Sequence, residues 1–388
     1  MDNNLITLGN KYNYLEDKYD YLIVGSGLYG SVCAYELHKA GKKVLVLERK
    51  DNIGGAISTC TRNKIVIHQH GPHIFHTNNK STWDYINQFG EFNNFINSPI
   101  AIYNDTVYSL PFNMYTFEKI YKCKNPNNIK KLIKNDTDKI DKDNITNLRE
   151  KAISLVGEPV YNILIKGYTE KQWGKSCTEL PPEIIERLPL RFTYDNRYYN
   201  DKYQGVPIRG YDYIIYNMLK DISIAWTDFL RNCDYWYNKA DKIIYTGAID
   251  EYYEYKYGVL DYRSLIFETH FIEDCENYQG NAVVNYTDRS TDYTRIIEHK
   301  WFNFGKDYNG KETNNTVITY EYPIDRQIGS YPYYPINDLK NKELYAEYRE
   351  LAKKDPKVIF GGRLAESKYY DMDDTIEAAL KTVEKELS

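Results

Sequence analysis

Three glycines near the start of the sequence have the spacing of a phosphate-binding turn. Gly25, Gly27 and Gly30 follow an apolar run at residues 19–24 and open a stretch that we expect to be helical from Leu28. In such a turn the first glycine lets the chain leave the strand sharply, the second lets the backbone approach a pyrophosphate, and the third lets the helix lie close to the sheet. The first N–H groups of the helix then face the phosphates. We therefore predict a dinucleotide-binding βαβ unit.

A carboxylate and a further glycine pair decide which dinucleotide is bound. Glu48 ends the next apolar run, about twenty residues further on, where a carboxylate accepts a hydrogen bond from a ribose hydroxyl. An R-x-x-x-x-G-G pattern directly follows Glu48 and consists of Arg49, Gly54 and Gly55. This pattern resembles the glutathione-reductase-like flavoproteins, which bind FAD rather than a free nicotinamide nucleotide. An ordinary glycine-rich turn after a strand is the alternative.

Two histidines in a Gly-Pro turn are the next groups that could do chemistry. His73 and His76 lie within residues 71–77, and by type alone they could ligate a metal ion. A metal site usually needs a third ligand, and since no nearby carboxylate or cysteine supplies one, we expect no metal. A turn hydrogen-bonded against the flavin and a packed loop are the two alternatives. The six cysteines form no C-x-x-C pair, so they suit neither a zinc site nor a disulfide frame, and they fit a reducing compartment.

Composition and charge argue against two classes of function. The 388-residue chain has a net charge of −5 and a pI near 5.9, so it offers no basic field for nucleic acid. No apolar run approaches the length of a membrane span, and residues 1–18 are polar and unlike a signal peptide. We therefore expect a soluble, cytoplasmic protein with no nucleic-acid partner. The 41 tyrosines accompany many Asn, Lys and Ile residues, which suggests an AT-rich genome, so most tyrosines are expected to be structural.

Periodicity predicts the elements that must position these groups. Alternating residues predict an antiparallel sheet, and a hairpin at 101–110 is expected to turn at Asn104 and Asp105. The sheet strands are expected at residues 264–268, 282–286, 294–298 and 316–320, with further strands at 64–68 and 242–247. Helices are expected at residues 78–98, in the polar stretch 115–157, at 210–220 and at 374–387.

The chain is long enough for two or three subdomains. The fold class that we predict is α/β, with a Rossmann-like, glutathione-reductase-like FAD-binding domain, an inserted helical subdomain and an antiparallel β-sheet subdomain. We assign residues 19–85, 205–250 and 335–388 to the FAD-binding domain, residues 112–187 to the helical subdomain with a mobile loop near 180–190, and residues 86–111, 188–204 and 251–334 to the sheet subdomain.

Several sequence blocks, in one order along the chain, resemble the UDP-galactopyranose mutase family. The likeness covers most of the chain from Tyr19 to the last helix and is interrupted mainly between residues 115 and 155. Independent blocks in one order are more specific than any single motif. The blocks are residues 71–77, 167–174, 262–265, 294–300 and 332–335, and residues 362–364 together with 370–373.

The resemblance implies an isomerase that uses FAD. It implies interconversion of UDP-galactopyranose and UDP-galactofuranose without net redox change, through a covalent adduct between reduced flavin and the anomeric carbon of the sugar. UDP leaves when the adduct forms and returns after the ring recloses. The FAD is active when reduced, so the resemblance also implies an external reductant such as NAD(P)H or a reductase, and it is compatible with a homodimer.

The resemblance also implies which side chains form the site. Arg187 and Arg295 match two diphosphate arginines and are expected to be catalytic, because guanidinium groups meet phosphate oxygens with paired donors and stay charged. His76 matches the turn beside the flavin, where it would tune the reactive nitrogen or simply pack. A surface salt bridge is the alternative for each arginine. Further substrate-binding matches are Tyr168, Thr169, Trp173, Tyr198, Arg263, Asn285, Tyr334 and Tyr369, and further cofactor-binding matches are His73, Arg363, Asp371 and Met372.

A few positions depart from the family pattern. Leu164 and Ile165 stand where the family usually has aromatic residues beside the uracil, so stacking would depend on Tyr168. These departures leave open a related substrate such as UDP-N-acetylgalactosamine. Two other hypotheses remain: a flavin oxidase or dehydrogenase, which would consume an electron acceptor steadily, and a non-catalytic protein that binds UDP without isomerising the sugar. The other departures are Ala56, His70, Arg197 and Ser367.

Overall fold

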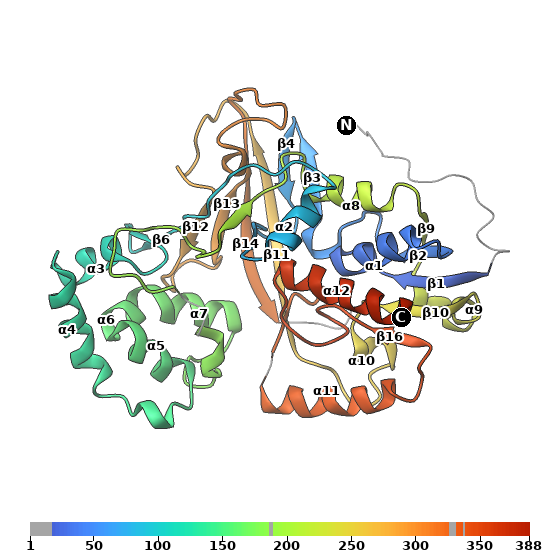
Figure 1. The fold of residues 1–388 in the computed structure, drawn as a ribbon. Coiled ribbons are helices and arrows are strands. Elements are labelled where there is room, and N and C mark those ends of the chain that lie inside the picture. The colour runs from blue at the N-terminus through green and yellow to red at the C-terminus, as the bar shows by residue number, and fades with distance from the viewer. Residues whose placement is uncertain (1–17, 186–188, 326–330, 337) are drawn as a thin grey trace.

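The computed structural model describes residues 18–185, 189–325, 331–336 and 338–388. Figure 1 shows three parts beside one another: an α/β part on the right, a tall sheet in the middle and a helical layer on the left. The segments that build the α/β part come from both ends of the chain, since β1 and β16 belong to one sheet.

The α/β part is organised by a five-stranded sheet in the order β16-β10-β1-β2-β9. Every pair in this sheet is parallel, as in a Rossmann-like fold. Leu22 and Ile23 of the central strand are fully buried, which explains the continuous apolar run there. The strands are β1 (Tyr19–Val24), β2 (Val44–Glu48), β9 (Ser223–Trp226), β10 (Ala240–Tyr245) and β16 (Val358–Phe360).

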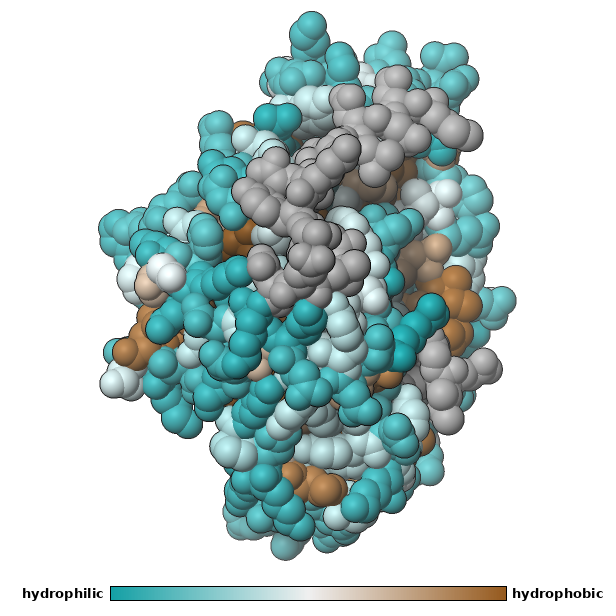
Figure 2. Space-filling view, turned by 90° about the vertical axis from the view of Figure 1, so that its right-hand side faces the viewer, coloured by the Kyte–Doolittle hydropathy of each residue, from teal (hydrophilic) through white to brown (hydrophobic). Residues whose placement is uncertain are grey.

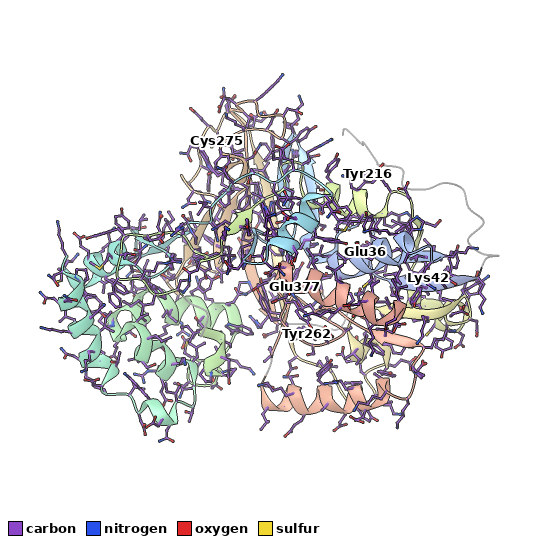
Figure 3. The ribbon with its side chains drawn as sticks, viewed as in Figure 1. Glu36, Lys42, Tyr216, Tyr262, Cys275 and Glu377 are labelled. Carbon is purple, nitrogen blue, oxygen red and sulfur yellow. The ribbon has the colours of Figure 1, made fainter. Side chains whose placement is uncertain are left out.

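Helices cover this sheet on both faces. α1 contacts α8 and α12, and together with β1 and β2 they share one apolar core. Glu377 of α12, labelled in Figure 3, ties this layer to α2, because its Oε1 accepts from Thr82 Oγ1 at 2.9 Å. The helices are α1 (Leu28–Lys39), α2 (Lys80–Asn87), α8 (Tyr211–Leu219), α9 (Cys233–Tyr237), α10 (Ile249–Tyr252), α11 (Leu339–Ala352) and α12 (Met372–Leu387).

The tall sheet has seven strands in the order β15-β11-β14-β13-β12-β6-β7. The four strands predicted for this sheet pair antiparallel, as expected, and the one parallel pair joins β12 to β6 of the hairpin, a contact that was not predicted. No tight turn joins β6 to β12, so nothing in the local chain forces them to be antiparallel. The strands are β6 (Ile100–Tyr103), β7 (Thr106–Ser109), β11 (Tyr262–Ile272), β12 (Val283–Tyr286), β13 (Arg295–Glu298), β14 (Thr316–Asp325) and β15 (Tyr334–Pro335).

Asparagines begin the helices of the helical layer. The side chains of Asn113, Asn125 and Asn147 accept hydrogen bonds from backbone N–H groups in the first turns of α3, α4 and α5. These bonds satisfy donors that a helix start leaves free. The layer has its own apolar core. Its elements are α3 (Met114–Tyr121), α4 (Pro126–Thr137), α5 (Leu148–Val156), α6 (Glu158–Val160), the π-helix η3 (Tyr161–Ile165) and α7 (Lys166–Trp173).

The helix expected over residues 78–98 is wrong beyond its first turns, because α2 ends at Asn87. A Cβ on Gly90 would lie 2.6 Å from Ile214 Cδ1, so the chain runs against α8 there. Asn93 then accepts from the N–H groups of Phe95 at 3.0 Å and Val206 at 3.1 Å. Such side-chain bonds offer the backbone an alternative to the helix.

Smaller elements connect these parts. β3 (Thr59–Arg62) pairs with β4 (Ile65–His68), and β5 (Phe75–Thr77) pairs with β8 (Tyr203–Gly205). Short helices occur at η1 (Gly55–Ile57), η2 (Lys142–Asn144), η4 (Pro182–Ile185), η5 (Phe229–Asn232) and η6 (His299–Asn303).

On the face in Figure 2, hydrophilic residues predominate and hydrophobic ones form small, separate groups. Within the described ranges, no helix is both long and apolar enough to cross a membrane.

Candidate functional site

The first part of the site is the glycine turn between β1 and α1. Gly25 has a φ of +103°, a left-handed conformation that favours glycine, and a Cβ on Gly30 would lie 2.1 Å from the Gly25 carbonyl oxygen. A Cβ on Gly27 would meet only Gly55 Cα, at 4.0 Å, so space remains above Gly27. The start of α1 has no side-chain cap and no acidic residue in its first turn. These features fit the pyrophosphate of a dinucleotide.

Glu48 lies at the end of β2, where a ribose acceptor is expected. Its buried carboxylate accepts from the backbone N–H and the hydroxyl of Ser26, at 2.8 and 2.6 Å, and from the Lys50 N–H at 2.9 Å. Because a carboxylate has about four acceptor positions, it retains capacity for a ligand hydroxyl. The Arg49 guanidinium donates from Nη1 to Glu251 at 3.0 Å.

A pocket opens beside this turn and is lined by most of the predicted cofactor residues. His73, His76 and Asp371 do not line it. Thr227 and Asp228, which line the pocket beyond Glu48, were missed by the sequence analysis, although their place directly after β9 could have indicated them. The predicted residues that line it are Gly25, Gly27, Leu28, Gly30, Glu48, Arg49, Gly54, Gly55, Arg363 and Met372. Others that were missed are Tyr29, Lys50, Tyr245, Tyr331 and Tyr333.

The two histidines of the Gly-Pro turn have different partners. His76 Nδ1 lies 2.7 Å from Asp201 Oδ2, and its ring stacks on Tyr199 with centroids 3.7 Å apart. His73 Nδ1 donates to the Gly71 carbonyl at 2.9 Å. Burial, then the neighbouring histidine and Arg363, lower the pKa of His73 to about 3, so it is neutral. The described part of the chain holds no cluster of metal-ligating side chains.

The second part of the site is a row of polar side chains across three strands of the tall sheet. Arg295 of β13 lies opposite Asn285 of β12 and opposite Glu321 of β14, and residues paired in this way point to the same face. Arg295 Nε lies 3.3 Å from Glu321 Oε1. Asn285 Oδ1 and Glu321 Oε2 are buried, and neither has a hydrogen-bond partner among the described residues.

The charge of this row is fixed by its surroundings. Burial would lower the pKa of Arg295, but Glu321 and then the phenols of Tyr168 and Tyr334 outweigh burial and raise that pKa well above its ordinary value. Arg295 Nη2 donates to the Tyr168 hydroxyl. Burial also raises the pKa of Tyr198 to about 12, with Tyr168 as the next cause. The phenols therefore remain protonated beside a permanent cation.

Other predicted tyrosines gather next to this row. Tyr334 and Tyr369 stack with centroids 6.4 Å apart, and the Arg363 guanidinium lies 4.9 Å from the centroid of the Tyr369 ring. Arg363 also lines the glycine-lined pocket, so it connects the two parts of the site. Asp371, at the start of α12, is close enough for its charge to contribute, after burial, to the raised pKa of Tyr198.

Some predicted substrate residues have mainly protein partners. Arg263 is buried, and it donates from Nε to the Gln172 carbonyl at 2.8 Å and from Nη1 to Asp325. Thr169 is buried on α7, and Trp173 packs against the core of the helical layer. Arg187 and part of the expected mobile loop lie outside the described residues.

The departures from the family pattern also have structural positions. Leu164 and Ile165 are buried in the core of the helical layer. The His70 ring lies parallel to Tyr331, with its Nδ1 2.7 Å from the Tyr333 hydroxyl, and burial followed by Lys50 lowers its pKa to about 4. The remaining three are Ala56, which lines the pocket, Arg197, which pairs with Asp195 at 2.8 Å, and Ser367, which has a φ of +45°.

Comparison with known proteins gives consistent results over nearly the whole chain. A family model described as UDP-galactopyranose mutase matches residues 163–369, and one described as an NAD(P)-binding Rossmann-like domain matches residues 23–89. A probable UDP-galactopyranose mutase of Klebsiella pneumoniae is 38% identical over 95% of this chain and 94% of its own length. A dTDP-fucopyranose mutase of Escherichia coli is 34% identical over 93% of this chain and 96% of its own length.

Solved structures agree at the level of the fold. A crystal structure of reduced UDP-galactopyranose mutase aligns with a TM-score of 0.76, at 13% identity, over 95% of this chain and 94% of that one. The Rossmann-like α/β architecture predicted from the glycine turn is thereby confirmed. The chain belongs to the UDP-galactopyranose mutase family and is an isomerase.

Proposed function

We propose that this chain is an FAD-dependent mutase that interconverts UDP-galactopyranose and UDP-galactofuranose. The observation that carries the proposal is the row of Asn285, Arg295 and Glu321, in which two buried oxygens, Asn285 Oδ1 and Glu321 Oε2, have no hydrogen-bond partner among the described residues. Buried polar atoms are seldom left unpaired, so such a row is typical of a site that a ligand completes. A sugar diphosphate offers the anionic and hydroxyl groups that this row would bind.

FAD is the cofactor that we propose for the glycine-lined pocket. When bound and reduced, it supplies the nucleophile for the anomeric carbon of the sugar. The start of α1 would hold its pyrophosphate, and Glu48 would accept from its ribose. Arg363 would help to hold the cofactor, since its guanidinium lines the pocket, and it also lies over the Tyr369 ring.

Arg295 would stabilise the diphosphate that leaves the sugar. Its guanidinium is held by Glu321 and Tyr168 before any substrate arrives, so it need not reorganise when negative charge develops. The phenols of Tyr198, Tyr334 and Tyr369 would donate to the same phosphates. Arg187 would supply the second guanidinium, and His76 with Asp201 would fix the turn beside the flavin.

A second substrate, a dTDP-linked fucopyranose, has one observation in its favour. A relative that is 34% identical over nearly its full length is named for this substrate. Leu164 and Ile165 are buried in the helical core, so the nucleobase would stack mainly on Tyr168. The test of function therefore includes both nucleotide sugars.

One experiment tests the proposed activity. The purified protein should show flavin absorbance, and after reduction it should interconvert UDP-galactopyranose and UDP-galactofuranose, as resolved by chromatography, without a steady supply of electron acceptor. Steady oxygen or nicotinamide consumption would instead indicate an oxidase or dehydrogenase, and UDP binding without isomerisation would indicate a binding protein. Conversion of dTDP-fucopyranose in preference to the UDP-sugar would reassign the substrate.

Further features of the enzyme are part of the same proposal. We propose an external reductant such as NAD(P)H or a reductase, a cytoplasmic location and a homodimer. We also propose the three-part division described above, with the FAD-binding domain assembled from residues 19–85, 205–250 and 335–388. The five strands of the parallel sheet fall within those three segments, which supports this division.

A further inference from the structure

One face of η3 and α7 is attached to the segment that joins β12 to β13. The Thr287 hydroxyl donates to the Ile163 carbonyl at 2.9 Å. Four residues further along, a Cβ on Gly167 would lie 2.3 Å from the Thr287 carbonyl oxygen, so the two backbones touch there. Lys171, four residues further again, makes the third attachment. Residues at this spacing lie on one helix face.

Lys171 is the strongest of the three attachments. Its partly buried Nζ donates to the carbonyls of Tyr286, Thr291 and Tyr293 at 2.9, 3.1 and 3.0 Å, and also lies 3.1 Å from the Thr291 hydroxyl. Asp288 shapes the same segment, because its Oδ1 accepts from the Thr291 N–H at 3.1 Å. A single ammonium group thus binds three backbone carbonyls of the segment between β12 and β13.

This segment leads directly to the row of polar side chains. Thr294 anchors its end, since the Thr294 N–H donates to the Glu321 carbonyl at 2.9 Å, and Arg295 follows. Tyr168 lies one turn before Lys171 on α7 and contacts Arg295 through its hydroxyl. Lys171 therefore joins the helix that carries Tyr168 to the segment that ends at Arg295.

We propose that Lys171 is a positioning residue for the mutase reaction: it docks α7 on the segment between β12 and β13 so that the Tyr168 hydroxyl meets the Arg295 guanidinium. The proposal rests on the function proposed above. Lys171 touches neither substrate nor cofactor in this assignment, and it acts through the contact between Tyr168 and Arg295. Displacement by about 1 Å in such a contact can lower the rate by about 100-fold.

The test is a double-mutant cycle on the reduced, FAD-loaded protein. We expect Lys171→Met and Tyr168→Phe each to lower kcat/KM for the UDP-sugar, by about 10- to 100-fold. If Lys171 acts through Tyr168, the double variant should lose little more than the worse single variant, since both changes disrupt one contact. Multiplicative losses, or wild-type kinetics in Lys171→Met, would overturn the assignment.

A second buried lysine provides a matched control. Lys300 is 2% exposed and lies within 3.3 Å of the carbonyls of Cys275, Thr313 and Asn315, none of which is a site residue. Lys300→Met should cost stability, but its effect on kcat/KM should be small and independent of Tyr168→Phe. Coupling of Lys300 to Tyr168 as strong as that of Lys171 would show a general packing effect and overturn the proposal.

Two further measurements keep the test decisive. If Lys171→Met does not give a folded, FAD-loaded protein, Lys171→Gln takes its place in the cycle, because it removes the ammonium group but leaves a polar side chain at the partly buried site. Lys171→Arg should restore part of the lost activity, because it keeps the positive charge and the donors. A wild-type protein that isomerises no nucleotide sugar would overturn the proposed function and this inference together, whereas an active wild type with an uncoupled cycle would overturn only the role of Lys171.

Discussion

Arg295 combines a permanent charge with a fixed orientation. Glu321, which is fully buried, faces its Nε, and the Tyr168 hydroxyl accepts from its Nη2. In the role that we propose for it, this guanidinium would be preorganised for a phosphate, because its own partners set its direction before a ligand binds.

Removing this guanidinium should abolish most of the activity and leave the cofactor bound. We expect Arg295→Ala to lower kcat by at least about 100-fold, the usual cost of losing one preorganised donor. FAD content, measured by absorbance, should be unchanged, because Arg295 does not line the cofactor pocket. Arg62→Ala is the control, since Arg62 is exposed and stacks on Phe271 at 4.6 Å. Normal turnover by Arg295→Ala would refute this role.

At the residue scale, the sequence predicted the groups whose neighbours are close in the chain. The spacing of Gly25, Gly27 and Gly30 was enough, because their roles depend on one turn. Glu321 was missed, since it meets Arg295 only through the pairing of β13 with β14. Asp201 was missed for the same reason, because its contact with His76 spans 125 residues.

Among the elements, the contact between β1 and α1 is the one that the glycine turn constrains most. A Cβ on Gly30 would lie 2.1 Å from the Gly25 carbonyl oxygen and 3.2 Å from Ile23 Cγ2, and the first of these neighbours is backbone that moves only with the strand. The close approach of α1 to β1 therefore determines where the first N–H groups of α1 lie.

Gly30→Ala should weaken FAD binding and destabilise the fold. We expect a loss of about 1–3 kcal/mol, the usual cost of overpacking, measured by urea unfolding. FAD affinity, from fluorescence titration of the apoprotein, should fall by at least about tenfold, since the start of α1, which we propose holds the pyrophosphate, must shift. Gly41→Asn at the other end of α1 is the control, because nothing lies within 4 Å of its Cβ position and asparagine tolerates its φ of +81°. Equal effects of the two changes would contradict this account.

The elements that were predicted well are those whose conformation depends on residues close together in the sequence. The turn of the hairpin between β6 and β7 has positive φ at both Asn104 and Asp105, as its sequence indicates. The parallel pairing of β6 with β12 could not be predicted, because periodicity shows that a strand has a buried face but not which strand it meets.

At the scale of the whole molecule, a chain of buried histidines joins the small β3–β4 pair to the tall sheet. The backbone N–H of His68 donates to the ring Nδ1 of His299 at 3.2 Å. The ring Nδ1 of His68 in turn accepts from the backbone N–H of His73 at 3.1 Å. Since Nδ1 of His299 is an acceptor, its Nε2 carries the proton and donates to Thr319 Oγ1 at 2.7 Å. These bonds require that His68 and His299 be neutral at the accepting atom.

The buried histidines His68 and His299 should make the free energy of unfolding depend on pH. Burial, and for His68 also the neighbouring His299, lower the pKa values of His68 and His299 from 6.5 to about 3. The unfolded chain therefore binds more protons than the folded one between these values. The contribution of the two neutral histidines to the free energy of unfolding is fully present above pH 6.5. It is lost as the pH falls toward 3, by about 1.4 kcal/mol per pH unit for each histidine.

Replacing one of these two histidines should reduce by one the number of protons that the protein takes up when it unfolds at low pH. In His68→Asn the amide oxygen can still accept from His73, but it has no proton to gain, so the variant should lose about 2 kcal/mol less than the wild type between pH 6.5 and 5. Urea unfolding of the FAD-loaded proteins at a series of pH values measures this difference. Parallel pH curves for His68→Asn and the wild type would mean that His68 is not held neutral by the fold.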